Sequence, residues 1–189
     1  MIENLYVVKS PRLATLKNHI NNMGSVKERQ FVESMGEGDV GEEAVAKYLA
    51  DNGFHSVIIT SGYNPNYDVS ALRGGSSTET PSIRYTYEVK TDMYRDTGNM
   101  AIELFCLRRQ KATGLFASQA DWYVYIFFHN KEAWFIKTDT LIELASQYPL
   151  KGMVTNGGDN NQAVMALIPK DVIREGGYVR DFTQYLVQE

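Results

Sequence analysis

Short apolar stretches separated by turn residues divide the middle of the chain into a series of expected β-strands. They cover residues 54–61, 66–72, 83–91, 100–107, 121–128, 132–138 and 163–169. The stretch DWYVYIFF at 121–128 has almost no polar interruption, which is typical of a strand buried on both faces in the middle of a sheet. The stretch at 132–138 follows it so closely that we expect the two to form a hairpin.

Apolar residues with helical spacing occur before, between and after these strands. Residues 11–34 predict one or two short helices, and Asp39 is a candidate N-cap for a helix that runs to about Asn52, where Gly53 ends it. Further helices are expected at 108–119, after a cap at Asp139, at 169–175 and at 178–187. Strands and helices in this order predict an α/β fold with a mixed β-sheet flanked by helices.

The length of the chain, 189 residues, is that of one domain with a substantial core. Within it we expect an N-terminal helical extension (1–37), a core (38–150) and a C-terminal strand with helices that pack on the core (151–189). The single cysteine, Cys106, excludes an internal disulfide framework and a zinc cluster built on cysteines. Because no apolar run approaches a membrane span or a signal peptide, we expect no membrane partner and a cytoplasmic location.

The formal net charge of -4 argues against a protein that coats nucleic acid, because such binding needs a surplus of Lys and Arg. The same charge is compatible with an enzyme whose acids form a metal site and whose basic residues are gathered elsewhere. One such basic cluster is Arg108, Arg109 and Lys111, and several Lys and Arg residues lie near the N-terminus. Clusters of this size are most often solvated faces, so they carry little weight alone.

The stretch YTYEVKTD at 85–92 places an acid and an amine on one face of an expected strand. Glu88 and Lys90 are two positions apart, and side chains two apart in a strand share a face. Taken alone, such a pair is more often a surface salt bridge than part of an active site.

Asp68 changes this picture because it lies on the neighbouring expected strand. If Asp68 and Glu88 lie at matching heights, two carboxylates meet, and such a pair is normally held together by a cation. Oxygen ligands favour Mg²⁺, or alternatively Mn²⁺, over zinc. The main-chain carbonyl of Val89 is a candidate for a further oxygen ligand.

Glu42 is a further candidate acid, on the expected helix that starts near Asp39. It lies three residues before Val45 and seven before Leu49, so it falls on the apolar, inward side of that helix. An inward-facing carboxylate needs a cation or hydrogen bonds. Glu42 can therefore complete the metal site through a water molecule, or it can simply cap the helix or pair with a nearby Lys.

Taken together, these residues resemble the PD-(D/E)XK nuclease superfamily. The helix GEEAVAKYLADNGF is similar to the first helix of archaeal-type Holliday junction resolvases, in which an acid stands in the place of Glu42. The stretch NPNYD resembles a degenerate PD element in which Pro65 is displaced from its usual place beside the acid, and EVK supplies the E-x-K element. The resemblance covers residues 38–128, and the flanking segments are of a kind often found in small viral or mobile-element nucleases.

The resemblance implies a restriction-endonuclease-like fold and Mg²⁺-dependent hydrolysis of DNA phosphodiester bonds, with junction-resolvase-like structure specificity as one form of that activity. It implies that Asp68 and Glu88 hold the metal and that Lys90 orients or deprotonates the attacking water. The resemblance also offers two candidates that would support the metal ligands from outside. Glu103, an acid among apolar neighbours, would do so, or act as an additional acid, near Glu88 if their strands pair, and Gln110 would do so near the start of the next helix. A homodimer is implied if the protein resolves junctions or cuts both strands.

DNA contacts are expected from local patches, because the net charge is negative. The candidates are Arg108, Arg109 and Lys111 for phosphate groups, and Tyr67 beside the site. One alternative is a catalytically silent member of the same fold that serves as a DNA-binding or protein-interaction module. The other alternative is an unrelated α/β binding domain in which Glu88 and Lys90 form a salt bridge.

Overall fold

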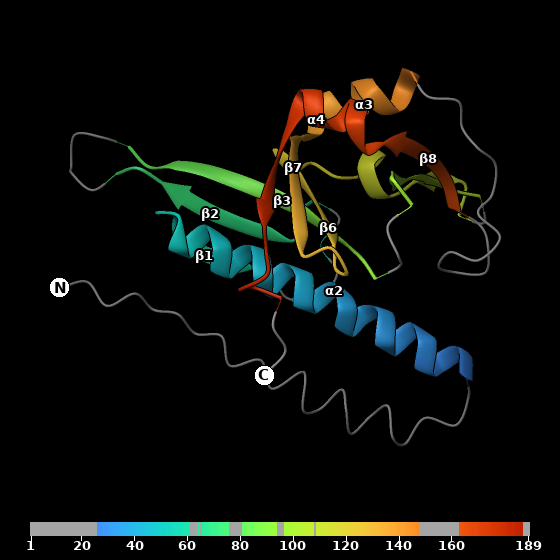
Figure 1. The fold of residues 1–189 in the computed structure, drawn as a ribbon, viewed down its shortest axis with the longest axis horizontal. Helices are drawn as coiled ribbons and strands as arrows, with labels where there is room; N and C mark the ends of the chain where they lie inside the picture. Colours follow the sequence, from blue (N-terminus) through green and yellow to red (C-terminus); the bar gives the residue numbers. More distant parts are fainter. Residues whose placement is uncertain are drawn as a thin grey trace.

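The computed structural model describes residues 26–60, 64, 66–75, 81–93, 97–107, 109–147 and 163–186, with side chains described from residue 38 onward. The helices are α2 (Val26–Asp51), α3 (Thr138–Gln147) and α4 (Lys170–Gly176), together with a short 3₁₀ helix η1 (Gly114–Phe116). The strands are β1 (His55–Ile59), β2 (Val69–Arg73), β3 (Ile83–Asp92), β4 (Asn99–Cys106), β5 (Lys111–Ala112), β6 (Trp122–Phe127), β7 (Glu132–Lys137), β8 (Ala163–Pro169) and β9 (Gly177–Asp181) (Figure 1).

The main sheet has six strands in the order β1-β2-β3-β6-β7-β9. Strands β3 and β6 run parallel, and the other neighbouring pairs run antiparallel. The predicted mixed sheet flanked by helices is therefore confirmed. The prediction that 121–128 forms a central strand is also confirmed, because β6 lies between β3 and β7 and residues 123–127 are buried.

A second sheet of three strands, in the order β5-β4-β8, contains the strand that carries Glu103. We expected Glu103 to lie near Glu88 on the condition that their strands pair. Strand β4 does not pair with β3, so this condition is not met. Buried and half-buried residues alternate along β4, so the strand buries one face only, whereas β6 buries nearly every residue. The place beside β3 in the middle of the sheet therefore suits β6.

Helix α2 is longer than the sequence indicated. It runs without a break from Val26 to Asp51, so Asp39 lies inside it and does not cap it, and the expected boundary between 37 and 38 falls within the helix. The part of the predicted segment 11–34 that precedes residue 26 lies outside the described residues. Asp39 suggested a helix start because it is a good capping residue, but α2 continues through Asp39 and through the glycines at 36, 38 and 41.

Two other predicted helices are wrong. In place of the helix predicted at 108–119, the described residues 109–119 form β5 and η1. Gly114 has a left-handed φ of +51°, and a Cβ at that position would collide with the backbone of Glu103 on β4. In place of the helix predicted at 178–187, the described residues include β9, which pairs with the edge of β7 and so supplies the hydrogen bonds that β7 would otherwise lack.

The remaining helices and strands agree with those predicted from the sequence, except for the start of one helix. The predicted strands at 54–61, 66–72, 83–91, 132–138 and 163–169 and the helix at 169–175 are confirmed, with small differences in their bounds. The hairpin between β6 and β7 is confirmed as well. Helix α3 starts at Thr138, so Asp139 lies in its first turn and is not its cap.

The two faces of the main sheet carry different layers. Helix α2 covers one face, where Tyr87, Val124 and Phe135 belong to the buried core, while α3, α4 and the second sheet lie over the other (Figure 1). Since alternate residues of β3 point to opposite faces, Glu88 and Lys90 point away from α2. No helix among the described residues is long and apolar enough to cross a membrane.

Helix α2 meets the sheet most closely at Gly41, which gives a test of this packing. A Cβ at Gly41 would collide with the hydroxyl of Thr91 on β3, and that hydroxyl is buried with no hydrogen-bond partner among the described residues. We expect Gly41→Ala to lower the free energy of unfolding by about 1–3 kcal/mol, although alanine is the better helix former. Chemical denaturation measures this change.

Gly38 in the same helix provides the control, because a Cβ there meets nothing within 4 Å. Gly38→Ala should stabilise the protein by up to about 1 kcal/mol. Adding Thr91→Ala to Gly41→Ala should restore most of the lost stability. Equal effects of alanine at Gly38 and Gly41 would show that α2 does not pack as described.

Candidate active site

Asp68 lies directly before β2 and is tied to β3. Val69 pairs with Tyr87, so Asp68 comes to lie opposite Glu88. The backbone N–H of Asp68 donates to the carbonyl of Tyr87 (2.9 Å), and its carboxylate Oδ2 accepts from the N–H of Val89 (2.8 Å). These two hydrogen bonds hold the Asp68 carboxylate at the same height along the sheet as Glu88.

The two carboxyl groups influence each other strongly. Burial raises the pKa of Glu88 to about 7, and the negative charge of Asp68 adds to this effect. A hydrogen bond from Ser118 and the charge of Lys90 act in the opposite direction. Burial also raises the pKa of Asp68, opposed by the N–H of Val89 and by Lys90. Near neutral pH Glu88 is therefore partly protonated.

Lys90 lies on the same face as both carboxyl groups. Its positive charge lowers the pKa of each of them, so it is within electrostatic range of the pair. Its side chain is exposed, whereas Asp68 and Glu88 are half-buried. The site thus presents an ammonium group that solvent, and hence a substrate, can reach.

Ser118 is a site residue that the sequence did not single out. It follows η1, its side chain hydrogen-bonds to Glu88, and its Oγ accepts from the N–H of Ala120 (3.2 Å). The next residue, Gln119, donates its N–H to the carbonyl of Asn66 (2.9 Å), which fixes this segment beside the segment before Asp68. A serine in the stretch FASQAD carries no sequence signal, because only the fold brings it to Glu88.

Tyr123 is also part of this region and links Glu103 to it. It pairs with Glu88 across β3 and β6 and is almost fully buried. Burial raises the pKa of its hydroxyl well above the ordinary value, and Glu88, Tyr125, Glu103 and Asp68 raise it further. Glu103 therefore lies within electrostatic range of the same hydroxyl as the two candidate ligands, although its strand belongs to the second sheet.

Glu42 approaches from the other face of the sheet. It is half-buried on α2, beside the buried residues Gly41 and Val45, and Gly41 packs against Thr91 of β3. The inward side of the helix at this point therefore faces the strand that carries Glu88 and Lys90, from the side opposite to them. Its role as a metal ligand through water stays a prediction.

The predicted DNA-binding residues are spread over several segments. Arg109 and Lys111 are exposed, at the turn before β5 and on β5, and Arg108 lies outside the described residues, as does Pro65. Tyr67 is half-buried, with the guanidinium of Arg84 5.9 Å from its ring centre. Gln110 does not begin a helix: it has a φ of +49° and lies, exposed, in the same turn.

The candidate metal ligands at Asp68 and Glu88 are all oxygen atoms. Among the described residues, no group of three or more His, Cys, Asp or Glu side chains is placed to hold a metal ion. The candidate ligands are Asp68, Glu88 and the carbonyl of Val89, which leaves β3 on the same side as the N–H that binds Asp68. Such donors fit Mg²⁺ or Mn²⁺, and a cation would relieve the repulsion between the two carboxylates.

The sequence was compared with protein-family models and with curated proteins. No protein-family model matches the sequence, and a search of curated proteins finds no significant match.

Proposed function

We propose that the protein is a Mg²⁺-dependent nuclease that hydrolyses DNA phosphodiester bonds at Asp68, Glu88 and Lys90. The observation that carries this proposal is the pair of half-buried carboxyl groups in which burial and Asp68 raise the pKa of Glu88 to about 7. Holding two like charges together costs free energy that a structural role does not require. Carboxyl groups perturbed in this way, with an exposed ammonium beside them, are typical of functional sites.

The order of elements supports the same proposal. Helix α2 precedes the β1-β2-β3 antiparallel unit, Asp68 lies directly before β2 and the E-x-K element lies on β3, an order that a restriction-endonuclease-like core would also have. The chain departs from the expected pattern between β3 and β6. Strand β5 and the 3₁₀ helix η1 occupy the place where a helix was expected, and the expected strand β4 lies in a second sheet.

Each residue has a distinct part in the proposed reaction. Asp68 and Glu88 would hold the metal, with Asp68 fixed by the N–H of Val89 and Glu88 by Ser118. Mg²⁺ bound there would act as a Lewis acid on the phosphate and make water a better nucleophile at neutral pH. Lys90 would neutralise the charge that develops on the phosphate, and it is placed to orient the attacking water.

The substrate contacts belong to the proposal as well. Arg109, Lys111 and Arg108 would bind phosphate groups, and Tyr67 would contact DNA beside the site. Structure-specific cleavage of branched DNA, a homodimeric state and a cytoplasmic location are further parts of the proposal. They rest on the resemblance and on the composition, which includes a single cysteine.

A cleavage assay on several DNA forms tests this function. Plasmid, linear, single-stranded and branched DNA are incubated with the protein in Mg²⁺, in Mn²⁺ and in EDTA. We expect cleavage of at least one form in each metal and none in EDTA. Absence of metal-dependent cleavage for every form would contradict the proposal and, if DNA still binds, would favour the silent binding module.

A further inference from the structure

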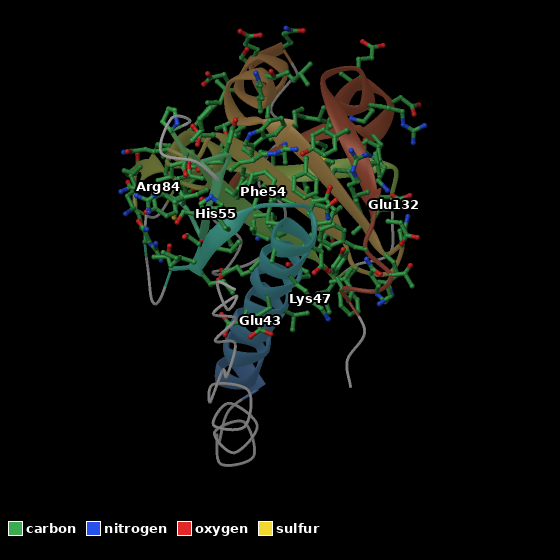
Figure 2. All side chains as sticks on the ribbon, turned by 90° about the vertical axis from the view of Figure 1, so that its left-hand side faces the viewer. Glu43, Lys47, Phe54, His55, Arg84 and Glu132 are labelled. Carbon is green, nitrogen blue, oxygen red and sulfur yellow. The ribbon has the colours of Figure 1, made fainter. Side chains whose placement is uncertain are left out.

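The face of the main sheet that carries α2 has a second surface with its own chemistry. The β2–β3 hairpin reaches past the C-terminal end of α2 (Figure 1), and Figure 2, which looks onto this end of the molecule, shows Phe54 beside the end of that helix. The side chains here are partly exposed aromatic rings and two exposed arginines. We call them the Arg73–Arg180 surface, which consists of Phe54, Arg73, Tyr85, Trp122, Tyr178 and Arg180.

Two arginines of this surface are held in place by aromatic rings. The guanidinium of Arg73 lies 5.1 Å from the ring centre of Phe54, and that of Arg180 lies 4.6 Å from the ring centre of Tyr178. Arg180 Nε also donates to the hydroxyl of Tyr48 (3.1 Å). The ion pair found among the described residues joins Lys170 and Glu132, so within this part of the chain neither Arg73 nor Arg180 has a carboxylate partner. Arg180 Nη1 donates to the carbonyl of Val179 as well (3.0 Å), and both arginine side chains are exposed.

The aromatic rings connect the two arginines. Phe54 meets Tyr85 edge to face at 5.9 Å, and Trp122 meets Tyr178 at 5.7 Å. Burial raises the pKa of Tyr178, and the charges of Arg180 and Arg73 lower it. Both guanidinium groups therefore lie within electrostatic range of the Tyr178 hydroxyl. The four rings pack against the buried core and keep part of their surface exposed. Tyr178 also stacks on Phe135, with 5.1 Å between ring centres and 4° between planes, and it carries Arg180, as Phe54 carries Arg73. Tyr85 and Trp122 are therefore the rings left to receive a base.

The nearby acids are engaged with other groups. Asp121 accepts hydrogen bonds from both the N–H and the hydroxyl of Thr86 (2.8 and 2.9 Å). Asp51, at the end of α2, accepts a hydrogen bond from Tyr185. Asp121 and Asp51 keep their negative charges, so the positive charge of this surface is local to the two guanidinium groups.

We propose that the Arg73–Arg180 surface binds single-stranded nucleic acid, with bases on the aromatic rings and phosphates on the two arginines. Aromatic rings combined with cations bind single strands without sequence preference, because every base has a face that can stack. Bases inside a duplex are stacked on both sides and offer no such face. The surface lies on the face opposite to Glu88 and Lys90, so the proposal does not depend on the proposed cleavage.

Tryptophan fluorescence provides a direct test, because the two tryptophans differ. Trp122 is half-buried on the surface, whereas Trp134 is 1% exposed in the core. Oligo(dT) and oligo(U) of about 12 nucleotides are titrated at low salt in EDTA, which removes any cleavage. We expect quenching of the emission, with oligo(dT) and oligo(U) showing whether DNA or RNA is preferred. Trp122→Phe should remove the quenching, which assigns the signal to this surface and not to Trp134, while anisotropy of a labelled oligonucleotide follows binding independently.

Substitution of the arginines gives the deciding comparison. Arg73→Ala together with Arg180→Ala should weaken binding at least tenfold and reduce the salt dependence of the binding constant by a slope of about 1.4, since each phosphate contact contributes about 0.7. The matched control is Arg174→Ala, because Arg174 is also exposed and also lies over an aromatic ring, 5.5 Å from that of Trp134. It is on α4, over the other face of the sheet, and should leave binding unchanged.

Three results would overturn the proposal. The first is that neither oligonucleotide binds at low salt. The second is that Arg174→Ala weakens binding as much as the two surface substitutions do, which would indicate non-specific charge. The third is that polyglutamate competes as well as oligo(dT), which would assign the surface to an acidic protein segment. Binding without cleavage in Mg²⁺ would support this proposal and contradict only the proposed nuclease function.

Discussion

Lys90→Ala is expected to lower the rate of Mg²⁺-dependent DNA cleavage by about 10³-fold, the size of effect that loss of one proton-transfer or charge-stabilising group typically has. Among the described residues, the exposed ammonium of Lys90 is the positive charge that lowers the pKa of both carboxyl groups. Because the side chain is exposed, the free energy of unfolding should change by no more than about 0.5 kcal/mol. Single-turnover cleavage with saturating protein measures the rate separately from DNA binding.

Lys47→Ala is the matched control for this substitution. Lys47 is an exposed lysine on α2, over the opposite face of the sheet, and its loss removes the same charge. Cleavage by Lys47→Ala should stay within about threefold of wild type. If Lys90→Ala cleaves as fast as Lys47→Ala, Lys90 has no part in the reaction.

Glu88→Gln is expected to stabilise the metal-free protein at neutral pH while it abolishes cleavage. The pKa of Glu88 is about 7 in the folded state against 4.5 for an ordinary glutamate, so the folded protein binds the proton more tightly than the unfolded chain does. Ionisation of Glu88 therefore lowers stability as the pH rises from about 4.5 to about 7, and the loss is complete above that range. A difference of this size corresponds to about 3 kcal/mol, which Gln at this position would recover.

The measurement is urea denaturation of both proteins between pH 4 and pH 8 in EDTA. The stability difference in favour of Glu88→Gln should be small at pH 4 and should grow to its full value near pH 7. Ser118→Ala removes the hydrogen bond that lowers the pKa of Glu88, so it should move the upper end of this range to higher pH. A stability difference that does not change with pH would mean that Glu88 is not perturbed as described.

The sequence predicted the part of the site that depends on strand alternation. Glu88 and Lys90 share a face because they are two apart in β3, and Asp68 meets Glu88 because β2 and β3 are joined as an antiparallel pair. These relations are local, so a period of two and a short connection are sufficient to predict them. The central position of β6 was predictable for a similar reason, since nearly every residue in it is apolar.

The features of the fold and of the site that the sequence did not predict depend on contacts between segments far apart in the chain. Strand β4 alternates like any other strand, and only its pairing with β8 shows that it belongs to a second sheet. Ser118 reaches Glu88 because Gly114 turns the chain against Glu103, which no local pattern indicates. Strand β9 forms where a helix was predicted, because the edge of β7 offers a row of hydrogen-bonding groups. Long-range pairing outweighs local preference in each of these cases.

The central claim is that Asp68 and Glu88 form a metal site at which DNA is cleaved. The measurement that tests it most directly is the single-turnover cleavage rate as a function of Mg²⁺ concentration, for wild type and for Asp68→Asn on the same DNA. We predict a rate that rises and saturates with Mg²⁺ for the wild type, and no measurable Mg²⁺-dependent cleavage for Asp68→Asn. Cleavage by Asp68→Asn at the wild-type rate, or wild-type cleavage that persists in EDTA, would contradict the claim.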